Sequence, residues 1–331
     1  MANSKQRSSQ KAKSTPKAPS KTARKSGKPG GRPPGAPPVH KATARDWIGG
    51  ARLRTLSLAI APVALGTATA FVLGDGEFHW VRALLCLAVA VGLQIGVNFA
   101  NDYSDGIRGT DQHRVGPSRL TGSGAASPRS VLIVALVFFA LAAAAGVALV
   151  VATGYYWLLA VGAAALLAGW FYAGGKRPYG YAGLGELFVF VFFGLVATAG
   201  TTFVQAGTVS LDSWLAGVAI GLFACAVLVV NNLRDIEQDR LANKRTLSTR
   251  IGTLGSRILF GVLMLAPYGV LVFFALLYLN APYVFLTLFI AIPAVIITST
   301  ARTPREYVLA LQLASLTALV FGLSLAWAIA F

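Results

Sequence analysis

"WVRALLCLAVAVGLQIGVNFANDYSDGIRGTD", residues 80–111, joins a long apolar run to a string of amides and carboxylates. The apolar part approaches the ~20 residues that a helix needs to cross the hydrocarbon core of a bilayer. A charged residue at bilayer depth costs about 3 kcal/mol even on the mild insertion scale. Amides and carboxylates at the end of such a run therefore predict a functional site at the membrane rim.

The composition extends this pattern to most of the chain. Of 331 residues, 55% are hydrophobic and only 12% are charged, whereas a soluble domain carries about 25% charged residues. Helices are the form that satisfies the backbone of such apolar segments in lipid. We therefore expect an all-α polytopic membrane protein with nine spans, near residues 53–73, 80–100, 130–152, 155–173, 184–206, 213–233, 257–279, 281–299 and 307–330.

The basic residues predict the orientation, because positive side chains concentrate in cytoplasmic loops. With the N-terminus in the cytoplasm, the connections 101–129, 174–183, 234–256 and 300–306 fall inside. Seventeen Lys or Arg follow residue 45, and of these only Arg82 lies on the outer side. We therefore expect a multi-pass protein of the cell (plasma) membrane with a cytoplasmic N-terminus and its C-terminus outside.

The N-terminal segment differs sharply from the rest. Residues 1–45 hold twelve Lys or Arg and no acidic residue, and they lack large apolar side chains. This composition predicts a disordered basic tail, 1–45, before one transmembrane domain, 46–331. The tail could tether the chain to anionic lipid, but we favour a solvated segment that keeps the N-terminus from crossing the membrane. Because no folded nucleic-acid-binding domain accompanies this charge, we expect no nucleic-acid partner.

The first polar cluster falls on one helix face. Asn98, Asn101, Asp102 and Asp105 are spaced by 3, 1 and 3 residues, and Gln94 continues this face one turn deeper. Asp111 follows Gly109, where we expect the helix to have ended.

A second cluster repeats the pattern in "NNLRDIEQDRLANKRTLSTR", residues 231–250. Asn231, Asp235 and Asp239 are spaced by 4 and 4 at the end of the sixth predicted span, whereas Glu237 falls on the other side and reads as a solvated charge. Two such clusters at matched depth favour a shared site. The alternative is that they are solvated helix ends paired with arginines of the inner loops.

Oxygen-rich clusters of this kind suit Mg²⁺ with substrate phosphates completing its shell. The aspartates 102, 105, 111, 235 and 239 sum to about −5 and a diphosphate adds about −3, so cations must bridge them. Basic side chains could clamp the remaining oxygens. The candidates are Lys176, Lys244 and Arg54, with Arg119 and Arg245 as weaker ones.

The two motifs resemble those of the UbiA superfamily of membrane prenyltransferases. "NDYSDGIRGTD" is similar to the first Asp-rich motif and "NNLRDIEQDRLANKRTL" to the second. "FYAGGKRPYGYAGLGE" and "RLRTLSLAIAPVALGTA" resemble the branch of 1,4-dihydroxy-2-naphthoate polyprenyltransferases, the MenA type. The resemblance covers about residues 46–331.

This resemblance implies nine helices around a central cavity, with polar cap loops on the cytoplasmic side. It implies Mg²⁺-dependent transfer of an isoprenoid from polyprenyl diphosphate to 1,4-dihydroxy-2-naphthoate, with decarboxylation, to give demethylmenaquinone. The resemblance implies the metal ligands Asn101, Asp102, Asp105, Asp111, Asp235 and Asp239 and the catalytic residues Asp102, Asp105, Asp235, Asp239, Lys176 and Lys244. The residue pattern itself adds the binding candidates Asn98, Asn231, Arg54 and Tyr172, beside Asn101.

The residues themselves agree with this chemistry. Loss of a metal-neutralised diphosphate would leave an allylic cation in a dry pocket, and Tyr172, Phe171 and Tyr179 could offer π faces to it. For Tyr179, a place in the aromatic belt at the membrane interface is favoured. Two other functions stay open: a related prenyltransferase acting on 4-hydroxybenzoate or a sugar phosphate, and a divalent-cation transporter. The transporter is disfavoured because the acids lie at one rim rather than at midplane.

Overall fold

The computed structural model describes residues 41–109 and 119–331. These residues form α-helices joined by short 3-10 and π segments, and they contain no strand. The elements are α1 Ala44–Ala51, η1 Leu53–Thr55, α2 Ser57–Leu73, α3 Trp80–Arg108, α4 Pro128–Thr153, α5 Leu158–Ala173, η2 Tyr179–Ala182, α6 Gly185–Val189, η3 Phe190–Val196, α7 Ala197–Ala206, α8 Leu211–Arg234, α9 Ile236–Leu241, α10 Leu247–Leu277, η4 Ala281–Thr287, α11 Leu288–Thr300 and α12 Pro304–Ala330.

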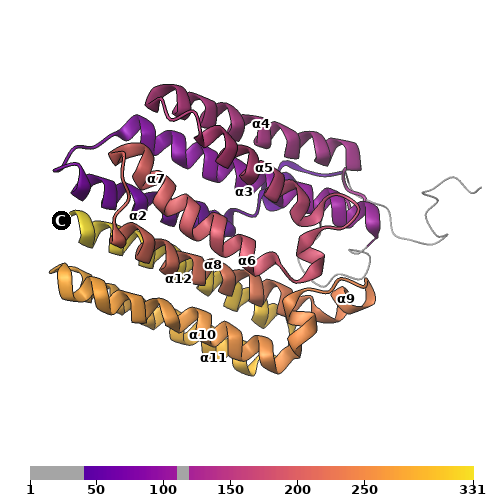
Figure 1. Cartoon of the computed structure of the whole chain (residues 1–331). Coiled ribbons are helices and arrows are strands. Elements are labelled where there is room, and N and C mark those ends of the chain that lie inside the picture. Colours follow the sequence, from indigo (N-terminus) through magenta and orange to yellow (C-terminus); the bar gives the residue numbers. More distant parts are fainter. Residues whose placement is uncertain (1–40, 110–118) are drawn as a thin grey trace, which may run out of the picture. The chain divides into compact units, whose positions relative to one another are not determined.

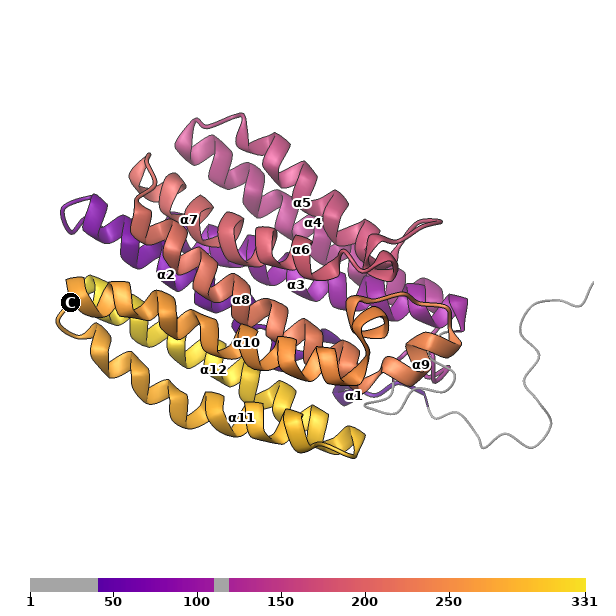
Figure 2. The ribbon, with the colours of Figure 1, turned by 60° about the horizontal axis from the view of Figure 1, so that its bottom comes forward.

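The long helices of residues 41–331 form a bundle (Figures 1 and 2). In Figure 1, α4 and α5 lie on one side and α10 and α11 on the other, with α2, α3, α8 and α12 between them. The closest packing joins α3 to α4, α8 to α10, and α2 to both α12 and α7. This arrangement confirms the predicted all-helical class.

The structure gives fewer candidate membrane spans than the nine predicted. By length and hydropathy, seven helices of the described residues could cross a membrane, or eight if the bent pair Ala44–Thr55 and Ser57–Leu73 is one span. The predicted span 155–173 corresponds to α5, whose 16 residues rise about 24 Å, short of the ~30 Å hydrocarbon core. The count of nine therefore stays a prediction, whereas the multi-pass nature of the protein follows from these helices.

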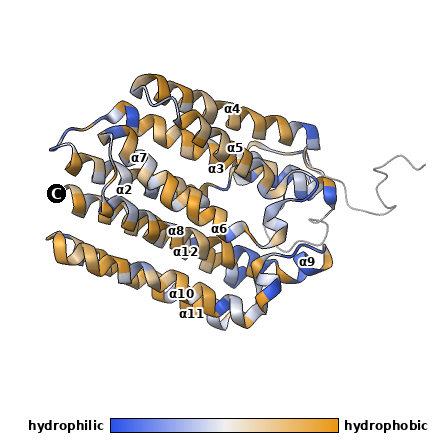
Figure 3. Ribbon diagram, in the orientation of Figure 1, coloured by the Kyte–Doolittle hydropathy of each residue, from blue (hydrophilic) through white to orange (hydrophobic). Residues whose placement is uncertain are grey.

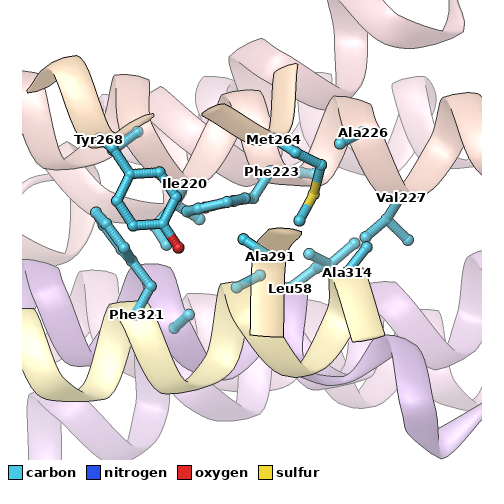
Figure 4. Packing of buried hydrophobic residues seen from close by; sticks show 14 of the residues in the cluster. Leu58, Ile220, Phe223, Ala226, Val227, Met264, Tyr268, Ala291, Ala314 and Phe321 are labelled. Atoms are coloured by element: carbon cyan, nitrogen blue, oxygen red, sulfur yellow. The ribbon is translucent and has the colours of Figure 1, made fainter. Parts of the chain in front are cut away.

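The largest apolar core lies between α2, α8, α10, α11 and α12. Phe223, Phe260, Phe274 and Phe321 are completely buried in it. Figure 4 shows Phe223, Phe321 and Tyr268 meeting within this core, and the rings of Phe223 and Phe321 have centroids 5.1 Å apart in an edge-on arrangement. Since aromatic pairs prefer this geometry, the core fixes how these helices sit on one another.

The segment α6–η3–α7 is a single apolar passage with a π-helical middle. Gly194 in this π segment lies so close to α8 that a Cβ added to it would be 2.6 Å from the carbonyl oxygen of Gly217. Such close approach requires glycine. The π turn therefore seats the passage tightly on α8, while its other residues line a cavity described below.

Polar residues gather at one end of the bundle (Figure 3), which we call the polar end: the last turns of α3, the loop with η2, the segment around α9, and the start of α10. It is formed by three of the connections predicted to lie inside. The predicted tail, 1–45, falls mostly outside the described residues, and α1 begins at Ala44. The boundary between tail and membrane domain therefore stays a prediction.

Candidate functional site

A cavity of about 450 Å³ lies between α2, α3, α4, α5, the α6–η3–α7 passage and α8. Most of its wall is apolar, including Val63, Val150 and Phe192. Most of its polar side chains come from the polar end of the bundle. They are Arg52, Arg54, Thr55, Asn98, Asn101, Asp105, Arg119, Tyr172, Tyr179, Tyr181, Asn231, Asn232 and Lys244, with Gln94 one turn deeper on α3 and Thr201 on α7.

Asn98 and Gln94 hold the break between α1 and α2 against α3. The amide of Asn98 donates to the carbonyl oxygen of Ala51 at 2.9 Å, and the amide of Gln94 donates to the hydroxyl of Thr55 at 3.0 Å. Arg52 in this break has a left-handed backbone, with φ of 53°. The polar face predicted on α3 therefore positions the two arginines, Arg52 and Arg54, that line the cavity.

The carboxylate of Asp102 binds backbone N–H groups of the segment that precedes α4. Its side chain is only 2% exposed, and its two oxygens accept from the backbone N–H groups of Leu120 and Thr121, each at 2.9 Å. Asp102 does not line the cavity. The structure thus places this predicted metal ligand where it fastens the 119–127 segment to the helix.

Asp105, in contrast, lies at the cavity and has polar partners from two other segments. One carboxylate oxygen is 2.6 Å from a guanidinium nitrogen of Arg119, and the other accepts a hydrogen bond from the hydroxyl of Tyr181. The same Arg119 also donates to the backbone oxygen of Asn101 at 3.0 Å. Because Asp105 is 4% exposed, this pairing offsets the cost of burying its charge.

Tyr181 contacts both Asp105, in the first acidic cluster, and Lys244, which follows the second. Its ring lies under two cations, with Lys244 Nζ 4.9 Å and the Arg108 guanidinium carbon 5.2 Å from the ring centroid. Burial, and then the neighbouring carboxylate of Asp105, raise the pKa of the Tyr181 hydroxyl above its usual value. The hydroxyl therefore stays protonated and donates to Asp105 at neutral pH.

Lys244 lies between the two acidic clusters. Its Nζ is 3.6 Å from a carboxylate oxygen of Asp239. Burial alone would lower the pKa of Lys244, but the carboxylates of Asp105 and Asp239 outweigh it and raise the pKa. The residue therefore carries a positive charge at the cavity wall.

The second cluster surrounds the end of α8. Arg234 donates to both oxygens of Asp235, at 2.7 and 2.6 Å, and to the side-chain oxygen of Asn231 at 3.0 Å. Asn231 lines the cavity, whereas Asp235 and Asp239 are buried behind it. Of the predicted acids in the described residues, Asp105 is therefore the one that reaches the cavity wall.

Aromatic rings flank the polar groups. Tyr172 packs edge-on against Tyr179 with ring centroids 5.6 Å apart, and Tyr179 stacks on Phe188 at 4.1 Å. All three line the cavity. Phe171 does not line it and is 46% exposed, so of the three aromatic residues predicted to offer π faces, Tyr172 and Tyr179 are the ones at the cavity.

Two residues considered in the sequence analysis, Lys176 and Glu237, lie away from the cavity wall. Lys176 is exposed and does not line the cavity. Asp111 lies outside the described residues. Glu237 is exposed and pairs with Arg240 at 2.9 Å, as expected for a solvated charge.

The oxygen atoms at the cavity wall decide whether Mg²⁺ could bind there. The side-chain oxygen of Asn101 is buried and has no hydrogen-bond partner among the described residues, one turn from Asp105. No group of three or more Asp, Glu, His or Cys that could hold a metal occurs within 41–109 and 119–331. Because Mg²⁺ is commonly held by one or two carboxylates with water and substrate phosphates, the donors fit an ion that a diphosphate helps to bind.

Sequence reasoning missed Tyr181 and Arg234. Tyr181 stands in "RPYGYAG", where loop geometry sets the direction of a side chain and no periodicity can indicate it. Arg234 directly precedes Asp235 in the sequence. An arginine within an acidic motif was a signal, because a buried carboxylate needs a charged partner.

A helical bundle with a buried polar cluster at one end of a largely apolar cavity is the architecture of a membrane protein whose site suits an amphipathic ligand. The family profile described as "UbiA prenyltransferase family" matches residues 59–310. This chain belongs to the UbiA prenyltransferase family, as its motifs predicted.

Two relatives are similar over most of the chain. A Mycobacterium tuberculosis protein named "1,4-dihydroxy-2-naphthoate octaprenyltransferase" is 49% identical over 88% of this chain and 98% of its own length. An Escherichia coli protein of the same name is 38% identical over 71% of this chain and 78% of its own length.

Solved structures share the fold. An apo UbiA homologue from Aeropyrum pernix K1 has a TM-score of 0.63 at 20% identity, covering 82% of this chain and 96% of that one. A UbiA homologue from Archaeoglobus fulgidus, bound to GPP and Mg²⁺, has a TM-score of 0.55 at 14% identity, covering 85% of this chain and 99% of that one.

Proposed function

We propose that this protein transfers a polyprenyl group from polyprenyl diphosphate to 1,4-dihydroxy-2-naphthoate, in menaquinone biosynthesis. The allylic C–O bond breaks and diphosphate leaves; a ring carbon of the acceptor forms the new C–C bond, and its carboxylate departs as CO₂. The product as formed is the quinol, which oxidation converts to demethylmenaquinone. The relatives in M. tuberculosis and E. coli that bear this activity in their names support the choice of acceptor.

The observation that carries the proposal is one cavity with two different parts. Asn101, Asp105 and Lys244 line its polar end, and apolar side chains line the remainder. A polyprenyl diphosphate has the same division, with a charged headgroup and a long apolar tail. Binding the headgroup at the polar end would place the tail among the apolar residues.

The residues at the polar end take separate roles in this proposal. Asn101 and Asp105 would hold Mg²⁺, which neutralises charge on the departing diphosphate. Lys244 and Arg54 donate hydrogen bonds to its oxygens. Arg119 and Tyr181 hold the Asp105 carboxylate in place, and Arg234 does the same for Asp235.

The remaining predicted acids position other groups beside the cavity. We assign Asp102 to fastening the 119–127 segment, and Asp239 to holding Lys244 beside the cavity. Tyr172 and Tyr179 face the reacting carbon with their π systems. We assign no contact with diphosphate to Lys176, because it lies exposed and outside the cavity wall.

For the whole chain we propose a plasma-membrane protein with its polar end in the cytoplasm, a basic tail over residues 1–45, and a membrane domain over 46–331. The concentration of Lys and Arg in the connections at the polar end supports this orientation.

Purified protein incubated with Mg²⁺, 1,4-dihydroxy-2-naphthoate and a polyprenyl diphosphate should yield the prenylated quinol, detected by mass. Chelation of the metal should stop the reaction. Product with 4-hydroxybenzoate but none with dihydroxynaphthoate would instead assign the chain to the other acceptor class. Metal flux into vesicles with no product from either acceptor would favour the transporter.

A further inference from the structure

The cavity is long in one direction. Cys86 and Asp105, which both line it, are 19 residues apart (105 − 86) on the single helix α3, which corresponds to about 28 Å. Asp105 marks the polar end, so a tail bound in the cavity extends toward the level of Cys86.

Mostly buried apolar side chains lie at this far end. Val63, Cys86, Leu149 and Val204 form a separate buried cluster, with Leu158 packed against it, and all five line the cavity. Nearby, the ring of Phe203 contacts Tyr155 and Trp157, with centroids 4.8 and 5.4 Å apart. We call the five cavity-lining residues the floor: Val63, Cys86, Leu149, Leu158 and Val204.

Two glycines stand one helical turn above the floor. Gly162 on α5 is four residues from Leu158, and Gly200 on α7 is four residues from Val204. Both glycines line the cavity, and a Cβ added to either would have no atom from elsewhere in the described chain within 4 Å.

Neither packing nor backbone conformation requires glycine at these positions. Neither residue has a positive φ, and glycine inside a helix is destabilising relative to alanine. What the missing side chains provide is open space in the cavity. A leucine at either position would occupy that space just before the floor.

We infer that Gly162 and Gly200 set which isoprenoid lengths the cavity accepts. This inference rests on the proposed function. Tyr172, at the polar end, is ten residues from Gly162 on α5, which is about 15 Å along the helix. A short tail whose headgroup binds at the polar end therefore ends before it reaches the glycines. A long tail must pass the level of the two glycines.

The test measures thermal stabilisation of the full-length protein in detergent with Mg²⁺ and either geranyl or octaprenyl diphosphate, with no acceptor present. Gly162→Leu and Gly200→Leu should keep the stabilisation by geranyl diphosphate. Their affinity for octaprenyl diphosphate should fall about tenfold, equivalent to about 1.4 kcal/mol. Gly269→Leu is the matched control: this α10 glycine also has no atom within 4 Å of an added Cβ, but it lies outside the cavity.

Equal loss of both diphosphates in the cavity variants, or octaprenyl affinity like that of the wild type, overturns the inference. Should a leucine variant fail to fold, Gly162→Ala and Gly200→Ala give a smaller change in the same direction, and unchanged octaprenyl affinity in them overturns it equally. Because acceptor is absent, a wild type that binds both diphosphates but prenylates no naphthoate would refute the proposed function and leave the length test intact.

Discussion

Asp105 joins the first acidic motif to the rest of the site, because its carboxylate meets Arg119 and Tyr181 at the cavity wall. We predict that Asp105→Ala lowers kcat for prenyl transfer by about a hundredfold or more, as removal of a preorganised charge contact does. Turnover is measured with dihydroxynaphthoate and a polyprenyl diphosphate. Glu237→Ala, which removes an exposed carboxylate paired with Arg240, is the matched control and should retain normal turnover. Normal turnover in Asp105→Ala would exclude this residue from the site.

Tyr181 acts through its hydroxyl on Asp105 and through its ring on Lys244 and Arg108. Tyr181→Phe removes only the hydroxyl. Since a hydrogen bond to a charged group contributes about 1.5–3 kcal/mol, kcat/KM for the diphosphate should fall about tenfold or more. Tyr181→Ala also removes the ring and should cost further activity.

The control for Tyr181 is Tyr283→Phe, which alters a tyrosine that is 66% exposed. An equal effect of both phenylalanine variants would argue against a specific role for the Tyr181 hydroxyl.

At the scale of elements, Asp102 joins α3 to the segment that precedes α4. Asp102→Ala leaves two backbone N–H groups, those of Leu120 and Thr121, without their acceptor. Each buried unsatisfied group costs about 1–3 kcal/mol, so thermal unfolding in detergent should occur at a clearly lower temperature. Activity lost in this variant should not return at higher Mg²⁺ concentration, whereas recovery would show that Asp102 is a metal ligand.

The contact between η3 and α8 gives a second prediction about elements. Gly194→Ala would place a Cβ 2.6 Å from atoms of Gly217 and Gly221. Overpacking of this kind costs about 1–3 kcal/mol, so the unfolding temperature should fall. Gly269→Ala adds the same methyl group on α10 where no atom lies within 4 Å. Equal unfolding temperatures for the two variants would mean that the helices separate easily at this contact.

Helices could be predicted because apolar length alone identifies them, and every predicted span overlaps a helix of the structure. The π segment and the shortness of α5 could not be predicted from the sequence, since both depend on packing against neighbouring helices. Helical periodicity grouped Asn98, Asn101 and Asp105, and these three residues line one cavity. It could not show that Asp102 turns to the following backbone, nor that Tyr181 enters from a loop, because loop conformation decides both.

For the whole molecule, the polar end brings together α3, η2 and the α9 segment, as contacts such as the hydrogen bond from Arg245 N to Tyr181 O at 3.0 Å show. Both native cysteines, Cys86 and Cys225, are buried. A membrane-impermeant maleimide should therefore leave the native protein unlabelled. This makes introduced cysteines clean reporters of orientation.

The orientation is tested with one exposed position at each end. Ser123→Cys lies before α4 at the polar end, and Thr208→Cys lies between α7 and α8 at the other. If the basic connections lie in the cytoplasm, maleimide should label Thr208→Cys in intact cells, and label Ser123→Cys only after the cells are opened. The reverse pattern would place the polar end outside, where the positive charge of its loops opposes the usual rule.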